Sequence, residues 1–434
     1  MVGEGRRGRG GGTRVRLFPQ ARFLDGFGEP VTVELSVPAG SCGAGPVDAR
    51  FETVVPIGKV GPYGPGTDRF GRPSWSGPPW RGRRALPARP DRFGHFDGIA
   101  VGDPAFLAAH AYGCARFALD VLEGYCGPVP WHFGRSLPRL EVLCQTGYDN
   151  AHCGWGFLEL GWNLKGRGLS HPYALNMDTV AHEMGHLVLF SLMGHADGLF
   201  LNGEYGGFHE AMADLAAFLV AAHLDPVVDA VLRATRGNLY IANELSRIVE
   251  LAPADQIRNL GHGVKMDQFR GGWSDEHDLS LPLAGAFFDI LVEVYQTLLV
   301  DAGLLSPEIV EIARNVDAML AFEHPVDAAF AAAYAAEPRP FRAAFASARD
   351  VLGHLLARLW RRLDPVGLTY AEVARQAVLV ERGLTGGRFE RAVRTSFAWR
   401  SIGVIAPGPR VRDPLRPRRR ALCDRAVRPP LQPA

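Results

Sequence analysis

Two histidines flank a glutamate in the run His182-Glu183-Met-Gly-His186. On a helix, residues four apart lie on the same face, so both imidazoles would point toward one ion while Glu183 stands beside them. This spacing is typical of zinc sites in which the glutamate is a general base. A catalytic zinc needs a third protein ligand and keeps a fourth position for water. A third ligand is therefore expected elsewhere in the chain.

The third ligand is expected in the segment Gly206-Gly-Phe-His-Glu210-Ala-Met-Ala-Asp214. Glu210 can complete a set with the two histidines, and Asp214 lies one helical turn further on the same face. There it would accept the N–H of a ligand imidazole, as carboxylates behind zinc sites commonly do. The alternative is a solvated helix face, but the neighbouring residues are apolar and isolated acids among them need a reason. We predict one zinc ion per chain, held by His182, His186 and Glu210.

Together these motifs resemble the thermolysin-like gluzincins, whose zinc is held by HExxH and by the glutamate of an ExxxD helix. The likeness extends over about residues 100–405, from AHAYGCARFALDVLEGY to SFAWRSIGV. It implies an α+β fold with the two lobes of a zincin catalytic domain, a β-containing N-terminal lobe and a mainly helical C-terminal lobe. It also implies a metalloendopeptidase that hydrolyses peptide bonds with zinc-activated water and Glu183 as the base.

The resemblance further implies roles for five other residues. Asn150 and Ala151 match an edge strand that binds the substrate backbone, and Arg247 matches a clamp for a substrate carbonyl. His277 matches a second catalytic histidine that donates to the oxyanion, and its acidic neighbours would raise its pKa. Tyr205 is a stand-in for the family's tyrosine donor. The alternatives are a helix-entry residue for His277 and an ordinary helix-surface arginine for Arg247.

Some positions depart from the family pattern. The gap between His186 and Glu210 is a few residues longer, and Leu201 falls where the tyrosine is expected. Asp178 is the one convincing acid for the family's structural calcium site, so calcium dependence stays open. Other histidines near the motifs (His152, His195 and His209) are interpreted as structural residues rather than ligands.

The chain divides into four parts by composition. Residues 1–95 are interpreted as a leader rich in Gly, Pro and Arg, with short strand-like pieces at 31–37 and 49–55 that pack on the next domain. Residues 96–190 form the N-terminal catalytic lobe, which begins with a helix over 103–124 capped by Asp103-Pro104. Residues 191–406 form the helical lobe. The last part, 407–434, has eight Arg against two Asp and many prolines, which favours disorder. Helices are expected at 208–234, 281–300, 306–320, 326–361 and 369–382.

The resemblance implies a peptide or protein substrate, and composition bears on the other possible partners. The 47 basic and 46 acidic residues leave a net charge of +1, which does not favour nucleic acid. No uninterrupted apolar stretch reaches the roughly 18 residues of a membrane span. We expect a monomer in the cytoplasm, because the first residues lack the apolar run of a signal peptide, or a secreted protein if the start site is misassigned. The six cysteines are expected to be mostly reduced, with one disulfide as the alternative for an exported chain.

Two other functions remain open at this point. The same zinc site could serve a narrow-specificity aminopeptidase, for which Glu204 could anchor a free amine. The domain could also be a non-catalytic zinc-binding scaffold, although such a scaffold would have no use for Glu183. In addition, the Arg-rich tail could tether an acidic partner.

Overall fold

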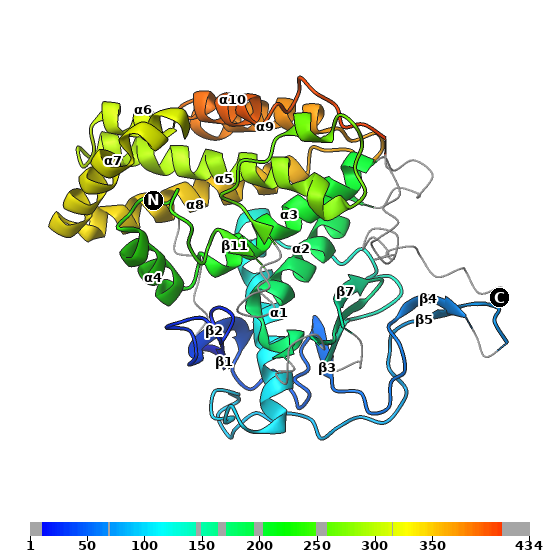
Figure 1. Ribbon diagram of the computed structural model, residues 1–434. Coiled ribbons are helices and arrows are strands. Elements are labelled where there is room, and N and C mark those ends of the chain that lie inside the picture. The colour runs from blue at the N-terminus through cyan, green and yellow to red at the C-terminus, as the bar shows by residue number, and fades with distance from the viewer. Residues whose placement is uncertain are drawn as a thin grey trace.

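The fold was analysed on a computed structural model. It describes residues 11–67, 70–144, 149–163, 171–194, 203–248, 258–314 and 316–409. Strands gather in the N-terminal part and helices fill the C-terminal part, so the predicted α+β class is confirmed (Figure 1). The first ten residues, Leu201, His195 and the tail beyond Pro409 lie outside the described residues.

The central sheet has four strands in the order β3-β6-β8-β7. Strands β3, β6 and β8 run parallel, whereas β7 is antiparallel to β8 and forms one edge. Four two-stranded ribbons accompany this sheet. The strands are β1 (Gly12–Leu17), β2 (Val31–Pro38), β3 (Phe51–Val54), β4 (Gly64–Thr67), β5 (Pro73–Ser76), β6 (Leu140–Cys144), β7 (Ala151–Gly154), β8 (Phe157–Leu160), β9 (Trp162–Asn163), β10 (His171–Pro172), β11 (Arg247–Ile248) and β12 (Arg258–Asn259).

The stretch assigned from sequence as a leader, 1–95, contributes structure to the main core. Strand β3 is the outer neighbour of β6 in the central sheet. In β1, Val15 and Leu17 are fully buried. His110 of helix α1 receives a hydrogen bond from the backbone N–H of Phe18 at 3.0 Å. The described part of this stretch thus packs against α1 and the central sheet, as expected for its β-structure.

Ten α-helices are found among the described residues. They are α1 (Pro104–Cys126), α2 (Met177–Met193), α3 (Gly203–Ala221), α4 (Asp225–Thr235), α5 (Glu276–Asp301), α6 (Pro307–Arg314), α7 (Val316–Ala336), α8 (Pro338–Trp360), α9 (Tyr370–Thr385) and α10 (Glu390–Trp399), with short 3₁₀ turns η1 (Tyr173–Leu175) and η3 (Met266–Phe269). Two predicted helices are each broken in two. The stretch expected at 208–234 bends by 96° between α3 and α4. The stretch expected at 326–361 divides at Glu337, and Pro338 stands in the first turn of α8, where proline is well tolerated.

Helices α2 and α3 pack against each other at unusually close range. A Cβ atom added at Gly185 of α2 would lie 2.8 Å from the Ala216 Cβ and 3.0 Å from the Ala213 Cα of α3. Real side chains do not pack so tightly, so glycine and two alanines are needed where the helices meet. Both helices lie in the middle of the molecule (Figure 1).

Two helices, α1 and α5, are long and apolar enough to cross a membrane by length and composition, and the bent pair α3–α4 passes the same test. In the fold, 83% of the apolar window of α1 and 72% of that of α5 are buried. Packing in the core therefore accounts for the apolar character of α1 and α5. The five cysteines in the described residues are all buried and none forms a disulfide there, as expected for most of them.

The chain end after α10 folds back onto the loop that precedes α5. The backbone N–H of Gly408 donates to the Phe269 carbonyl at 2.7 Å, and the N–H of Trp273 donates to the Pro409 carbonyl at 3.2 Å. These bonds lie beyond residue 406, which was the predicted end of the helical lobe. The loop that they fasten leads directly to Asp275 and His277.

We predict that a chain ending at Ala406 is less stable than a chain ending at Pro409. The shorter chain loses both backbone hydrogen bonds, each worth about 0.5–1.5 kcal/mol. Chemical denaturation of the two truncated proteins measures the difference directly. Equal free energies of unfolding would show that these residues do not fasten the loop.

Candidate metal centre

Helix α2 begins where a side-chain cap can form. The Asn176 side chain accepts a hydrogen bond from the Thr179 N–H at 3.2 Å, which satisfies one of the free donors of the first turn. From Met177 to Phe190 every residue of α2 is buried. Helix α3 is likewise buried from Tyr205 to its end. The polar residues of both motifs are therefore held inside the protein, where each charge needs a partner.

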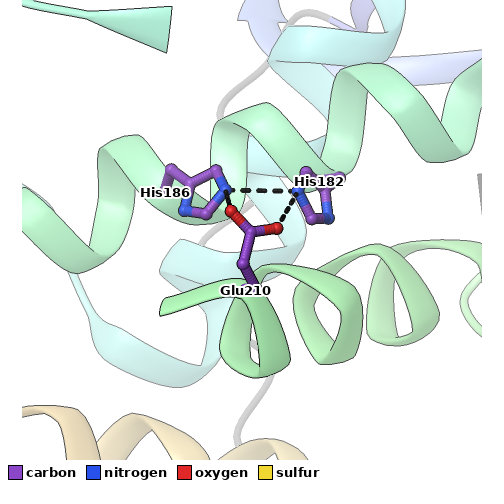
Figure 2. A group of neighbouring side chains, drawn as sticks. All are labelled: His182, His186 and Glu210. Atoms are coloured by element: carbon purple, nitrogen blue, oxygen red, sulfur yellow. Dashed lines mark hydrogen bonds and ion pairs between the residues drawn. The ribbon is translucent and has the colours of Figure 1, made fainter. Parts of the chain in front are cut away.

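The predicted ligands converge between these two helices. The Nε2 atoms of His182 and His186 lie 3.2 Å apart. The Glu210 carboxylate approaches both, with Oε2 at 3.4 Å from His182 and Oε1 at 3.6 Å from His186. Figure 2 shows the two imidazoles on one helix pointing at the carboxylate on the other. All three ligand atoms lie within 4.8 Å of one another, and all three residues are buried, so the group can hold a metal ion.

The protonation states in this group follow from burial and from the neighbouring charges. Burial lowers the pKa of His186 to about 3, which keeps its imidazole neutral. Burial opposes the charge on Glu210, but the surrounding histidines outweigh it and hold the pKa of Glu210 well below its usual value. For His182, burial is outweighed by hydrogen bonds with Asp214 and Glu210, which raise the pKa to about 9. Neutral imidazole and ionised carboxylate are the forms that bind zinc, so His182 must release its extra proton when it ligates.

A buried acid and a buried arginine stand behind His182. Asp214 Oδ1 lies 2.8 Å from His182 Nδ1, as predicted from its place on the helix face. The Arg258 guanidinium holds the same carboxylate, with Nη2 at 2.7 Å from Oδ1 and Nε at 2.5 Å from Oδ2. Burial would raise the pKa of Asp214, but Arg258 and His182 outweigh it and lower that pKa. The carboxylate therefore stays ionised and orients the imidazole.

A second histidine stands behind His186. Nδ1 of His209 lies 2.9 Å from Nδ1 of His186, and His209 is fully buried. His209 directly precedes Glu210 on α3. It was interpreted from sequence as a structural residue, and the structure places it against a candidate ligand.

Glu183 is enclosed next to the ligand group. It is 3% exposed, and burial raises its pKa to about 7, against the opposing effects of His182 and of a hydrogen bond with Cys153. A carboxylate with a pKa near 7 suits a general base at neutral pH. Cys153 lies on β7, two residues after Ala151. Alternate residues of a strand face the same side, so both side chains point toward α2.

His277 reaches the ligand group from the start of α5. Its Nε2 lies 3.2 Å from Glu210 Oε2, and its Nδ1 lies 2.7 Å from Asp275 Oδ1. The side chain is 26% exposed, more than any ligand. Burial lowers its pKa, but Glu210 and Asp275 outweigh this and raise it, as expected. The side-chain cap of α5 is Asp275 rather than His277.

Other candidates lie in different surroundings. Asn150 is exposed just before β7, and Ala151 is buried as the first residue of that strand. Arg247 is partly exposed, with Nη1 at 3.6 Å from Glu244 Oε2. The guanidinium that pairs with Asp214, behind His182, belongs to Arg258 instead. Tyr205 is buried, and its ring centroid lies 5.0 Å from that of His209.

Glu204 and Asp178 are engaged in structural contacts. Glu204 Oε2 accepts a hydrogen bond at 2.6 Å from the backbone N–H of Tyr370, the first residue of α9. Asp178 is buried and accepts from Gln20 Nε2 at 3.4 Å. Within the described residues, the set of His182, His186 and Glu210 is the one group of three or more potential ligands close enough to share an ion.

Sequence reasoning missed three residues of this site. A buried Asp214 requires a buried cation, which was the one sequence signal for Arg258. Spacing alone could not show which basic residue of the chain supplies that cation. The signal for Cys153 was the two-residue period that it shares with Ala151. The only sequence signal for His209 was its position directly before the candidate ligand Glu210.

The sequence matches no protein-family model and no curated protein. Among solved structures, the chain is similar to the precursor of protealysin, a metalloproteinase from Serratia proteamaculans. The two share 14% sequence identity with a TM-score of 0.48, over 85% of this chain and 90% of the other. A likeness of this size carries no argument about function, which must rest on the site itself.

We predict that replacing Arg258 with Met destabilises the protein strongly. The variant leaves the Asp214 carboxylate buried without its cation, which typically costs about 3–5 kcal/mol of unfolding free energy. The double variant Arg258→Met/Asp214→Leu removes both charges and should recover much of that loss.

The double variant should nevertheless bind zinc about 10–100-fold more weakly, because His182 has lost its carboxylate support. Denaturation curves and chelator competition separate the two effects. If the double variant keeps wild-type metal affinity, Asp214 supports only the fold.

Proposed function

We propose that the protein is a zinc-dependent metalloendopeptidase of the thermolysin-like kind, with His182, His186 and Glu210 as ligands and Glu183 as general base. The observation that carries the proposal is the convergence of the three ligand atoms within 4.8 Å, next to the buried carboxylate of Glu183. The donors suit zinc, because two imidazoles and one carboxylate leave a coordination position open. Asp214 behind His182 and His209 behind His186 also suit a zinc site, in which ligand imidazoles commonly have hydrogen-bond partners of this kind.

A zinc ion bound to these residues would supply Lewis acidity, lowering the pKa of a coordinated water and polarising a peptide carbonyl. Glu183 would accept the water's proton and pass it to the nitrogen of the leaving amine. Its pKa of about 7 permits both steps at neutral pH. Asp214 and Arg258 keep the His182 imidazole oriented while the charge of the site changes.

We propose that His277 donates to the oxyanion that develops during attack, and its contacts support this role. Asp275 holds its Nδ1, so the Nε2–H faces the metal-ligand carboxylate. A protonated imidazole favours this role, and the two acids raise the pKa of His277 in that direction. Tyr205 is a weaker candidate because it is buried against His209.

The peptide substrate would bind as an extended strand along β7. This strand pairs with β8 on one side, and its other side is an edge of the described sheet. An added strand gains backbone hydrogen bonds without any particular side-chain sequence. Asn150 and Ala151, at the start of β7, are the proposed contacts, and Ala151 would help receive the new amine. Arg247 stays the proposed clamp for a substrate carbonyl, and Arg258, which lies beside the ligand group through Asp214, is an alternative.

The aminopeptidase alternative loses support from the structure. Such an enzyme needs an acid that is available for a free α-amine, and Glu204 instead accepts a backbone hydrogen bond at the start of α9. The scaffold alternative differs from the proposal in its use of Glu183, and activity measurements separate the two.

We expect purified protein to contain about one zinc per chain and to cleave members of a diverse peptide library. His182→Ala and Glu210→Ala should each lose most of the metal. Glu183→Gln should keep zinc and melting temperature but lose at least about 100-fold in hydrolysis, because the proton acceptor is gone.

Glu293→Gln is a matched control, since Glu293 is a largely buried glutamate of α5 that pairs with Arg314 of α6. It should keep both zinc and activity. Stoichiometric zinc in both ligand variants would refute the ligand set. Zinc binding with no hydrolysis by the wild type would favour a scaffold.

A separate variant tests His277. If it stabilises the transition state, His277→Ala should lower kcat by about 100–1,000-fold and leave KM, zinc content and melting temperature nearly unchanged. Asp275→Ala removes the helix cap and should cost about 1 kcal/mol of stability. A His277→Ala protein that melts early yet turns over normally would return His277 to a purely structural role.

A further inference from the structure

His209 lies between the metal site and an aromatic wall. Its ring centroid is 4.4 Å from that of Phe190 and 5.0 Å from that of Tyr205, and the residue is fully buried. On α3 it directly precedes the ligand Glu210, yet its ring faces the other helix, toward His186. The rings of Phe190, Tyr205 and His186 therefore fix where the Nδ1 atom of His209 can lie.

The two imidazoles meet in the geometry of a hydrogen bond. Their ring planes differ by 17°, their centroids are 5.2 Å apart, and their Nδ1 atoms are 2.9 Å apart. Rings stacked face to face cannot bring two atoms this close, because van der Waals contact sets in first. The nitrogens must therefore approach edge to edge, and the distance is normal for a nitrogen donor and its acceptor.

The direction of this bond is fixed by the role of His186. Its Nε2 faces Glu210 and His182, so it must be the ligand atom and must carry no proton. The proton of the neutral ring is then on Nδ1, which donates to His209. Nδ1 of His209 must be bare to accept it, so the proton of His209 is on Nε2.

We propose that His209 is a positioning residue for the metal site, accepting the Nδ1–H of His186 and so holding the Nε2 lone pair of that ligand toward the ion. This rests on the proposed zinc function. The two ligand histidines are thus supported differently, His182 by an ionised carboxylate and His186 by a neutral imidazole. A neutral acceptor adds no further negative charge to a buried site that already contains Glu210, Asp214 and Glu183.

Two variants of equal shape test the acceptor. Asn places its amide oxygen three bonds from Cα, the same separation as Nδ1 of histidine, and Leu has the same branched skeleton with no polar atom. His209→Leu should weaken zinc binding by about 10–100-fold, because the His186 N–H is left buried without an acceptor. His209→Asn should recover most of the affinity. Chelator competition with Zn²⁺ and with Co²⁺ measures both.

His223→Leu is the matched control. His223 lies just past the other end of α3 and bonds the Leu219 carbonyl and the Tyr125 hydroxyl. Its loss should lower the melting temperature without changing metal affinity. Melting curves in the presence of chelator show whether each variant is folded before metal is added.

A second measurement tests the tautomers directly and does not depend on comparing the stabilities of variants. Imidazole ¹⁵N NMR of the wild-type protein with zinc bound should find the His209 proton on Nε2 and the His186 proton on Nδ1, with signals assigned through His209→Asn. The opposite tautomer of His209, or equal zinc affinity of the Leu and Asn variants, overturns the proposal. If the wild type binds neither metal, the zinc function itself fails. If it binds both and His209→Leu binds as tightly, only the role of His209 fails.

Discussion

The close contact between α2 and α3 at Gly185 governs the geometry of the site. With Ala213 and Ala216 opposite, no side chain separates the two backbones, and any larger residue would have to push them apart. Glu210 has a short side chain compared with the width of two packed helices, so it meets both imidazoles only at this spacing. The glycine inside the HExxH run is therefore as much a part of the site as the ligands that flank it.

Burial then determines what must surround the ligands. Six ionisable groups from two helices share one enclosed region, and a buried charge persists only with a partner. The arrangement resolves this as two chains of contacts, from Arg258 through Asp214 to His182, and from His209 to His186. Glu210 joins them and receives His277 from a third helix. Arg258, Asp214 and His209 thus each serve the charge balance of the site as well as the orientation of an imidazole.

Sequence reasoning anticipated what depends on local spacing. It found the two-helix ligand pattern, the α+β class and most helices, because hydrophobic periodicity and i, i+4 geometry are properties of short segments. It could not find what depends on tertiary packing. Arg247 lies on β11 and Arg258 on the paired strand β12. Only the folded structure shows that it is Arg258 that reaches Asp214. The packing of β1 and β3 into the core also follows from long-range pairing that a Gly- and Pro-rich composition conceals.

The state of Glu183 bears on the choice between a catalytic and a structural ion. Its Oε2 is buried and, among the described residues, has no hydrogen-bond partner. An unsatisfied buried carboxylate oxygen costs free energy, and a purely structural site could remove that cost with an apolar residue at the same position. Proteins tolerate such local violations mainly where function requires them. A base that must take up and release a proton needs an oxygen that no neighbour has already claimed, and this favours the catalytic interpretation over the scaffold.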